Sequence, residues 1–153
     1  MTQKQKGFTL IELLVVISII ALLAVTVFVA LDPVKRFADA RNSRRWSDVN
    51  EMITAVHEYI VDNKGAFPAG LSTGLVATQL GSCATGGATL CSGAAAACVN
   101  LATPLAKYLK AMPFDNKVGS ATSTAYKVEV DANNIVTITA CASENGEVIS
   151  VSR

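Results

Sequence analysis

The residue whose chemistry most needs an explanation is Glu12, because it is the only charged residue in an apolar run from Phe8 to Leu31. A carboxylate within an apolar helix costs about 2.5–3.5 kcal/mol near the centre of a bilayer and less near its surface, so such residues are usually functional. Glu12 lies about one turn from the start of the run, where it can also be tolerated by snorkelling or by protonation. The residue alone therefore leaves a functional and a merely tolerated carboxylate open.

The second chemically distinctive set consists of four cysteines, all of which follow the apolar run. None forms a Cys-x-x-Cys pair, which argues against zinc and favours disulfides formed in an oxidising compartment. The sequence does not choose among the three possible pairings. The pairing we favour joins Cys83 to Cys91 and Cys98 to Cys141. The second bond would close roughly 44 residues and contribute about 4 kcal/mol in the chain-entropy description.

No constellation typical of an enzyme is found in the sequence. His57 is the only histidine, and no nucleophile motif, phosphate-binding loop or metal-ligand spacing surrounds it. We assign His57 no chemistry and expect the chain not to be an enzyme.

The apolar run predicts a helix that crosses a membrane. Residues 8–31 would form about 36 Å of helix, which exceeds the roughly 30 Å hydrocarbon core of a bilayer. A secretory signal peptide would be shorter and would end in a small-x-small cleavage site. The candidate sites here carry Phe28 two residues before Ala30 and Leu22 two residues before Ala24. We therefore expect the helix to be retained.

A specific motif opens this run. A short leader with Lys4 and Lys6 is followed by Gly7 and then by the sequence Phe-Thr-Leu-Ile-Glu at residues 8–12. This pattern resembles the class III signal of type IV pilins and of the pseudopilins of type II secretion, and it matches residue for residue from Gly7 to Glu12. The resemblance implies cleavage after Gly7 by prepilin peptidase and N-methylation of the new terminus at Phe8.

The resemblance also implies a role for Glu12 and a set of partners. In that family the glutamate neutralises the terminal amine of a neighbouring subunit as filaments assemble. The implied partners are further copies in a homo-oligomeric filament, prepilin peptidase, an inner-membrane assembly platform and membrane lipid. We expect the helix to insert in the cytoplasmic membrane with the C-terminal domain outside, and the chain then to join a cell-surface or periplasmic filament.

Three functions remain open at this point. The first is the structural subunit of a type IV pilus-like filament, with adhesion, motility and DNA uptake not distinguished. The second is a pseudopilin of a type II secretion system that drives protein export, and a less favoured third is a membrane-anchored binding module. Nucleic acid is not an expected partner, because 13 basic residues balance 12 acidic ones and no basic face is evident.

Five basic residues lie shortly after the apolar run, on the side where the positive-inside rule predicts few if the C-terminal domain is exported. They are Lys35, Arg36, Arg41, Arg44 and Arg45. We favour a solvated helical face for them, and contact with lipid phosphates or with acidic residues of a neighbouring subunit is the alternative. The leader motif and the cysteines outweigh this cluster in setting the orientation.

The predicted fold class is α+β: a long N-terminal helix, its first half transmembrane, packed against a small antiparallel sheet as in pilins. We divide the chain into a cleaved leader (1–7), a transmembrane or filament-core helix (8–31) and a globular domain (32–153). Asp32-Pro33 predicts a break or kink, with Asp32 as a possible cap of the next helix. Trp46, Val49, Ile53, Val56 and Ile60 then form an apolar stripe.

Within the globular domain the predicted elements follow from periodicity and from helix-stop signals. They are a helix over 34–62, a cysteine-containing loop over 63–103, a short helix over 104–111 and a sheet over 125–151, the last with a third strand at 147–151. From 81 to 98 the residues are small and uncharged, with Leu90 the only large one, so disulfides are expected to hold this loop in place.

One segment bears on the choice between pilin and pseudopilin. Residues 108–115 are similar to the Tyr-Leu…Pro-x-Asp segment of major pseudopilins, in which nearby loop oxygens bind calcium, but Asn116-Lys117-Val118 replaces the Pro-Trp-Gly that usually follows. Asp115 and Asp131, with Asn133, are weak candidates for a hard cation and are equally ordinary turn residues. We therefore predict no cofactor and retain calcium only as the alternative.

Overall fold

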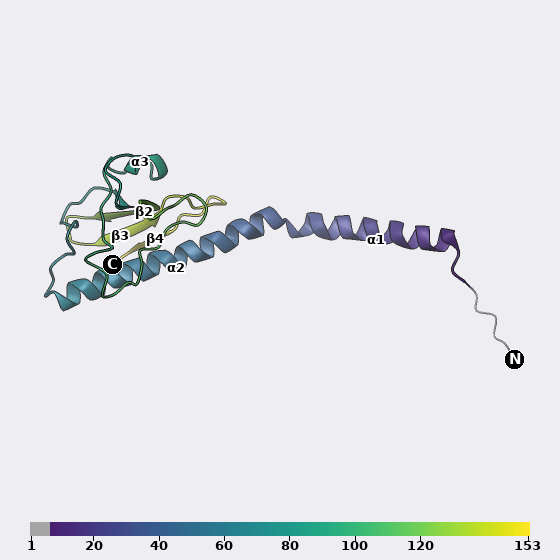
Figure 1. The fold of residues 1–153 in the computed structure, drawn as a ribbon, viewed down its shortest axis with the longest axis horizontal. Coiled ribbons are helices and arrows are strands. Elements are labelled where there is room, and N and C mark those ends of the chain that lie inside the picture. The colour runs from purple at the N-terminus through teal and green to yellow at the C-terminus, as the bar shows by residue number, and fades with distance from the viewer. Residues whose placement is uncertain (1–6) are drawn as a thin grey trace. The chain divides into compact units, whose positions relative to one another are not determined.

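The computed structural model describes residues 7–153, in two compact units that meet after Phe37. The leader residues Lys4 and Lys6 lie outside the described residues. The first unit contains helix α1 and the start of helix α2, and the second contains the rest of α2 with four strands and the short helix α3 (Figure 1). The unit boundary lies six residues beyond the boundary at 31/32 that the sequence predicts.

Helix α1 spans Leu10–Leu31 and buries none of its side chains. Its residues are apolar on every side, which is the composition of a helix surrounded by lipid or by other apolar helices rather than by water. Its few hydroxyl groups are satisfied within the helix, because Ser18 and Thr26 donate to the carbonyls of Leu14 and Leu23. α1 is long and apolar enough to cross a membrane.

Asp32 separates α1 from α2, which spans Pro33–Asp62. Asp32 has a left-handed backbone with φ of 37°, and its carboxylate accepts a hydrogen bond from the Lys35 amide at 3.3 Å. Pro33 occupies the first position of α2, where a missing N–H costs nothing. The expected break and the capping role of Asp32 are therefore both found.

The second part of α2 packs against a four-stranded sheet through its apolar stripe. Val49, Ile53 and Val56 have no exposed surface, and the sheet contributes side chains such as Tyr126 and Ile138 to the same core. Each buried aliphatic side chain contributes about 1.5–3 kcal/mol relative to exposure. This cluster accounts for the attachment of the sheet to the helix.

The sheet is antiparallel throughout, in the order β1-β2-β3-β4. Its central pair aligns Tyr126 with Ala140, Val128 with Ile138 and Val130 with Val136, so the inward side chains of neighbouring strands face one another. In Figure 1 the sheet lies between α2 and α3. The strands are β1 (Thr78–Gly81), β2 (Ser123–Val130), β3 (Val136–Ala140) and β4 (Ser150–Ser152), and α3 is Gly87–Leu90. The predicted fold class, a long helix on a small antiparallel sheet, is confirmed.

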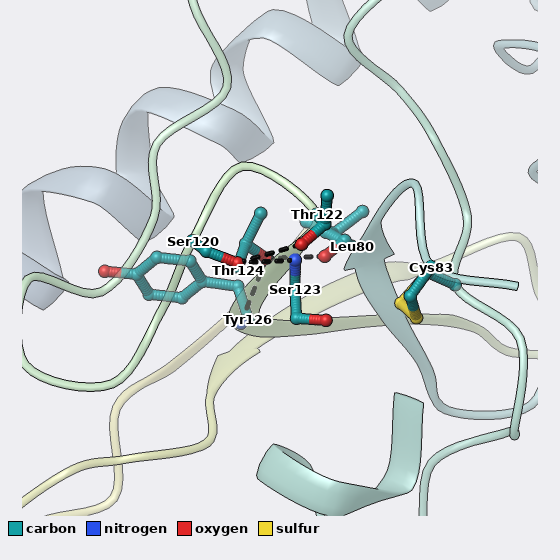
Figure 2. The surroundings of a disulfide bond; sticks show 8 residues. Leu80, Cys83, Ser120, Thr122, Ser123, Thr124 and Tyr126 are labelled. Carbon is teal, nitrogen blue, oxygen red and sulfur yellow. Dashed lines mark hydrogen bonds between the residues drawn. A yellow bond between two sulfur atoms is a disulfide. The ribbon is translucent and has the colours of Figure 1, made fainter. Parts of the chain in front are cut away.

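The pairing of β1 with β2 contains an irregularity between Gln79 and Gly81. A side chain at Gly81, where φ is +145°, would place its Cβ 2.2 Å from the carbonyl oxygen of Thr122, so only glycine fits. The hydroxyl of Thr124 donates to the Leu80 carbonyl at 2.7 Å and closes the irregular part of the ladder (Figure 2).

Three predicted elements differ from the structure. Residues 102–108 form turns and 109–111 are irregular or bent, because so short a segment gains too few hydrogen bonds to offset helix nucleation. The predicted loop over 63–103 contains β1 and α3, and β1 is buried at all four positions, so it shows no alternation. The last strand occupies Ser150–Ser152 rather than 147–151, because a turn continues through Gly146 and Glu147.

The prediction of two disulfides is confirmed, but the favoured pairing is wrong. The bonds join Cys83 to Cys98 and Cys91 to Cys141. Val99 forms a parallel bridge with Leu80, which brings Cys98 against the residues that follow β1. Helix α3 contacts β1 and β2, so Cys91 at its end meets Cys141 just after β3. Tertiary packing across the sheet, rather than proximity along the chain, decides the pairing.

We expect the Cys91–Cys141 bond to contribute more stability than the Cys83–Cys98 bond. The two bonds span sequence separations of 50 and 15 residues, which correspond to about 4 and about 3 kcal/mol of chain entropy, and Cys91 is also completely buried. Urea unfolding of the C91S/C141S and C83S/C98S double variants measures this difference. Equal losses in the two variants, or a larger loss in C83S/C98S, would contradict the expectation.

Candidate functional site

The first candidate site is the start of α1, where Thr9 and Glu12 form a reciprocal capping box. The Thr9 hydroxyl accepts from the Glu12 amide at 3.3 Å, and the Glu12 carboxylate oxygen Oε2 accepts from the Thr9 amide at 2.8 Å and the Thr9 hydroxyl at 2.7 Å. Such boxes satisfy amide groups that a helix start leaves without partners. The box holds the carboxylate beside the first residues of the helix.

Gly7 and Phe8 precede this box in an exposed, non-helical segment. Phe8 is 83 % exposed, and a Cβ added to Gly7 would meet no atom within 4 Å. The Gly7–Phe8 peptide bond is thus accessible to an enzyme. If it is cleaved, the new amine on Phe8 lies one residue before Thr9. Each hydrogen bond that the described residues make to the Glu12 carboxylate goes to Oε2. Oε1 can therefore face a cation from another molecule.

The exposed surface of α1 is the third part of this site. It presents large apolar side chains along its whole length, including Ile11, Ile19 and Phe28, each more than half exposed. An apolar surface of this extent needs lipid or protein around it. The arrangement can therefore anchor the chain in a bilayer and pack against copies of itself.

The second candidate site is a buried ion-pair network that joins α2 to two loops of the globular unit. Arg45, with 2 % of its side chain exposed, donates from Nε to Asp115 at 2.5 Å and from Nη1 to Glu144 at 3.0 Å. Arg41 and Lys117 donate to the same Glu144 at 2.6 and 2.5 Å. Two carboxylates thus meet three cations on the side of α2 that faces the sheet.

The network shifts the pKa of both carboxylates downward. For Asp115, burial alone would raise the pKa, but hydrogen bonds from Arg45 and from the amides of Lys117 and Val118 outweigh it and leave the pKa lowered. Hydrogen bonds from Arg41, Lys117 and Arg45 hold the pKa of Glu144 far below its usual range, against a smaller opposing effect of burial. Both groups are therefore ionised in the folded protein at neutral pH.

The network corrects, for Arg41 and Arg45, the prediction that the basic cluster is a solvated helical face. Arg45 is buried and Arg41 is partly buried, and both pair with acidic residues of their own chain rather than with those of a neighbour. The spacing of Arg45 could have predicted its burial. It lies four residues before Val49 and so extends the buried stripe of α2 towards the start of the helix. Lys35, Arg36 and Arg44 remain exposed.

The weak calcium candidates are not brought together. Asp115 accepts hydrogen bonds from Arg45 and from two amides of its own loop. Asp131 caps the turn between β2 and β3 by accepting from the amides of Asn133 and Ile135. Within residues 7–153 no three His, Cys, Asp or Glu side chains are grouped as metal ligands would be. Both carboxylates are used as turn and ion-pair acceptors.

His57 has no role in either site. It lies on α2, partly buried, and no group in the described part of the chain forms a hydrogen bond with its buried Nδ1 atom.

Comparison with known proteins returns one family. A protein-family model described as the prokaryotic N-terminal methylation motif matches residues 2–28. This motif is the class III signal of the type IV pilin and pseudopilin family, whose members are structural proteins rather than enzymes. No curated protein and no solved structure matches the chain.

We expect Asp115→Asn to destabilise the globular unit by about 3 kcal/mol, because it leaves a buried guanidinium without one of its carboxylates while Glu144 still compensates it in part. Asp131→Asn is the matched control: it makes the same change in an exposed turn, and we expect it to alter stability by less than about 0.5 kcal/mol. Chemical denaturation of both variants provides the measurement. A loss below about 1 kcal/mol for Asp115→Asn would show that the pair contributes little.

The lowered pKa values also predict acid sensitivity. A carboxyl group whose pKa is lower in the folded than in the unfolded state stabilises the fold above its unfolded pKa, about 4 for Asp and Glu, and this stabilisation is lost as the pH falls towards the folded pKa. Urea midpoints measured from neutral pH downwards should therefore begin to fall near pH 4–5 and continue to fall at lower pH. Asp115→Asn should show a shallower decline. A midpoint that stays constant down to about pH 3 would be incompatible with this role.

Proposed function

We propose that this prepilin-like chain, which carries the class III signal of the pilin and pseudopilin family, is the structural subunit of a type IV pilus-like filament. In this proposal prepilin peptidase cleaves after Gly7, and Phe8 becomes the N-methylated first residue. α1 then holds the chain in the cytoplasmic membrane, with the C-terminal unit outside, until an assembly platform moves it into the filament.

The observation that carries the proposal is the combination of this motif with a helix that has no exposed polar stripe. α1 presents apolar side chains in all directions and buries none of them within the chain. In this proposal, membrane lipid covers this surface before assembly, and the α1 helices of other copies cover it in a filament core. A signal peptide would need the first environment only.

Glu12 acquires a specific role in this scheme. Inside a filament core of low polarity, a carboxylate and an ammonium group stabilise each other more than they do in water. We propose that Glu12 pairs with the Phe8 ammonium of an adjacent copy. The capping box supports this role because it fixes the carboxylate at the start of the helix while Oε1 has no hydrogen bond from the described residues.

The structure of the globular unit favours the pilus over the secretion pseudopilus. The segment that resembles calcium-binding pseudopilins ends at Asp115, whose carboxylate is occupied by Arg45 and two backbone amides. Two disulfides hold the long loop in place, which fits an oxidising compartment and so suits either filament. The pseudopilin remains the second candidate function.

Purification of surface filaments from the native host tests the proposal. We expect this chain in the filaments, with an intact mass that corresponds to N-methyl-Phe8 at the start and two disulfides. A product that begins at Met1, or beyond the apolar run, would overturn the assignment to a filament subunit. Filaments found only when secretion components are overproduced would instead favour the pseudopilin.

Glu12→Gln separates an electrostatic role from a tolerated carboxylate. The change keeps the shape and part of the hydrogen bonding but removes the charge, so an uncompensated amine would cost about 3–5 kcal/mol per subunit if it is buried. We expect normal cleavage and membrane insertion but no filaments. Glu129→Gln, the same change at an exposed position of β2, should assemble normally. Filament yield and intact mass are the measurements, and a normal yield from processed Glu12→Gln would exclude the ion pair.

A further inference from the structure

The first turn of α2, residues Val34, Lys35, Arg36 and Phe37, has a composition that the filament function does not explain. We call these four residues the interfacial turn. Val34 is 75 % and Phe37 66 % exposed, and Lys35 and Arg36 are exposed as well. Two apolar side chains and two cations therefore share one exposed turn, which lies in the same compact unit as α1.

The distance along the chain places this turn at the level of lipid headgroups. α1 comprises 22 residues, about 33 Å of helix, and so covers the roughly 30 Å hydrocarbon core once. The headgroup layer extends about 5–7 Å beyond that core on each side. Lys35 and Arg36 follow Leu31 by four and five residues, within reach of this layer for long basic side chains.

The two cations of the interfacial turn form few polar contacts within the described part of the chain. The Arg36 guanidinium donates from Nε to the Leu31 carbonyl at 2.9 Å, and no described residue accepts a hydrogen bond from its two terminal nitrogens. Asp32 accepts from the Lys35 amide and Asp39 from the side chain of Asn145, and neither carboxylate forms an ion pair with Lys35 or Arg36. Arg41 and Arg45 differ, because they are already paired with Glu144 and Asp115.

We propose that the interfacial turn binds the phosphate groups of anionic lipids in the leaflet on the C-terminal side of α1. Lys35 and Arg36 bind the phosphates, and the exposed side chains of Val34 and Phe37 lie beside them at the headgroup level. The proposal rests on the membrane insertion described under Proposed function. Its basis is the continuity of the turn with the apolar helix and the complementarity between two cations and an anionic surface.

This assignment also explains the unusual placement of basic residues after the apolar run. Arg41 and Arg45 stabilise the folded globular unit, Lys35 and Arg36 contact lipid, and the exposed Arg44 is assigned no role. The subunit would thus be held at a defined depth in the membrane, and its entry into a filament would require these phosphate contacts to be released.

Lipid retention by the full mature chain provides the test. The chain is reconstituted in nanodiscs of phosphatidylcholine with a minority of phosphatidylglycerol, released in mild detergent and examined by native mass spectrometry. We expect phosphatidylglycerol to be enriched among the retained lipids, by roughly fivefold per cation, and K35Q/R36Q to lose most of this enrichment. K64Q/K110Q is the matched control, because it also removes two exposed cations, which lie in the globular unit, outside the interfacial turn.

The outcomes separate this proposal from the membrane insertion on which it rests. Resistance of each variant to alkaline extraction from membranes reports on insertion alone, and we expect it to be unchanged. The proposal is overturned by equal phosphatidylglycerol enrichment in the wild type and K35Q/R36Q, by an equal loss in the control, or by no enrichment in the wild type. A K35Q/R36Q variant with normal enrichment but fewer filaments would assign the turn to contact with a second copy instead.

Discussion

The buried pairing of Arg45 with Asp115 and Glu144 constrains two loops of the globular unit at once. It joins α2 to the loop before β2 and to the loop before β4. Arg45 lies just before the apolar stripe of the helix begins at Trp46. Charges buried in this way stabilise a structure only while every partner is present, because an unpaired one is costly. The network therefore fixes where both loops lie against the helix, while the apolar core fixes how the sheet packs.

The two compact units differ in how their apolar and charged side chains are kept from unfavourable surroundings. The globular unit buries apolar side chains between α2 and the sheet, and it pairs its buried Arg45 with Asp115. α1 buries nothing and relies on lipid or on other copies of the chain. Its one charge, Glu12, is held by Thr9 in a capping box that requires only local sequence. The proposed move from a membrane into a filament would suit such an anchor, because no partner within its own chain has to be released first.

Periodicity and local sequence signals were sufficient to predict a helix or strand wherever that element has one buried face. The alternation of Tyr126, Val128 and Val130 predicted β2, and the stripe from Val49 to Val56 predicted the buried face of α2. They failed where burial is complete or where the partner is distant along the chain. β1 is buried at each position and so shows no alternation, and the segment 104–111 is too short to be a stable helix without help from its surroundings.

The sequence by itself determined the cleavage motif, the membrane-length helix, the α+β class and the number of disulfides, because each depends on residues close together or on composition. Only the tertiary structure decided which cysteines pair and what the basic cluster does. Cys91 meets Cys141, and Arg45 meets Asp115, across separations of 50 and 70 residues. Contacts at that range depend on how α2, α3 and the sheet pack together. The spacing of residues along a single element does not predict this packing.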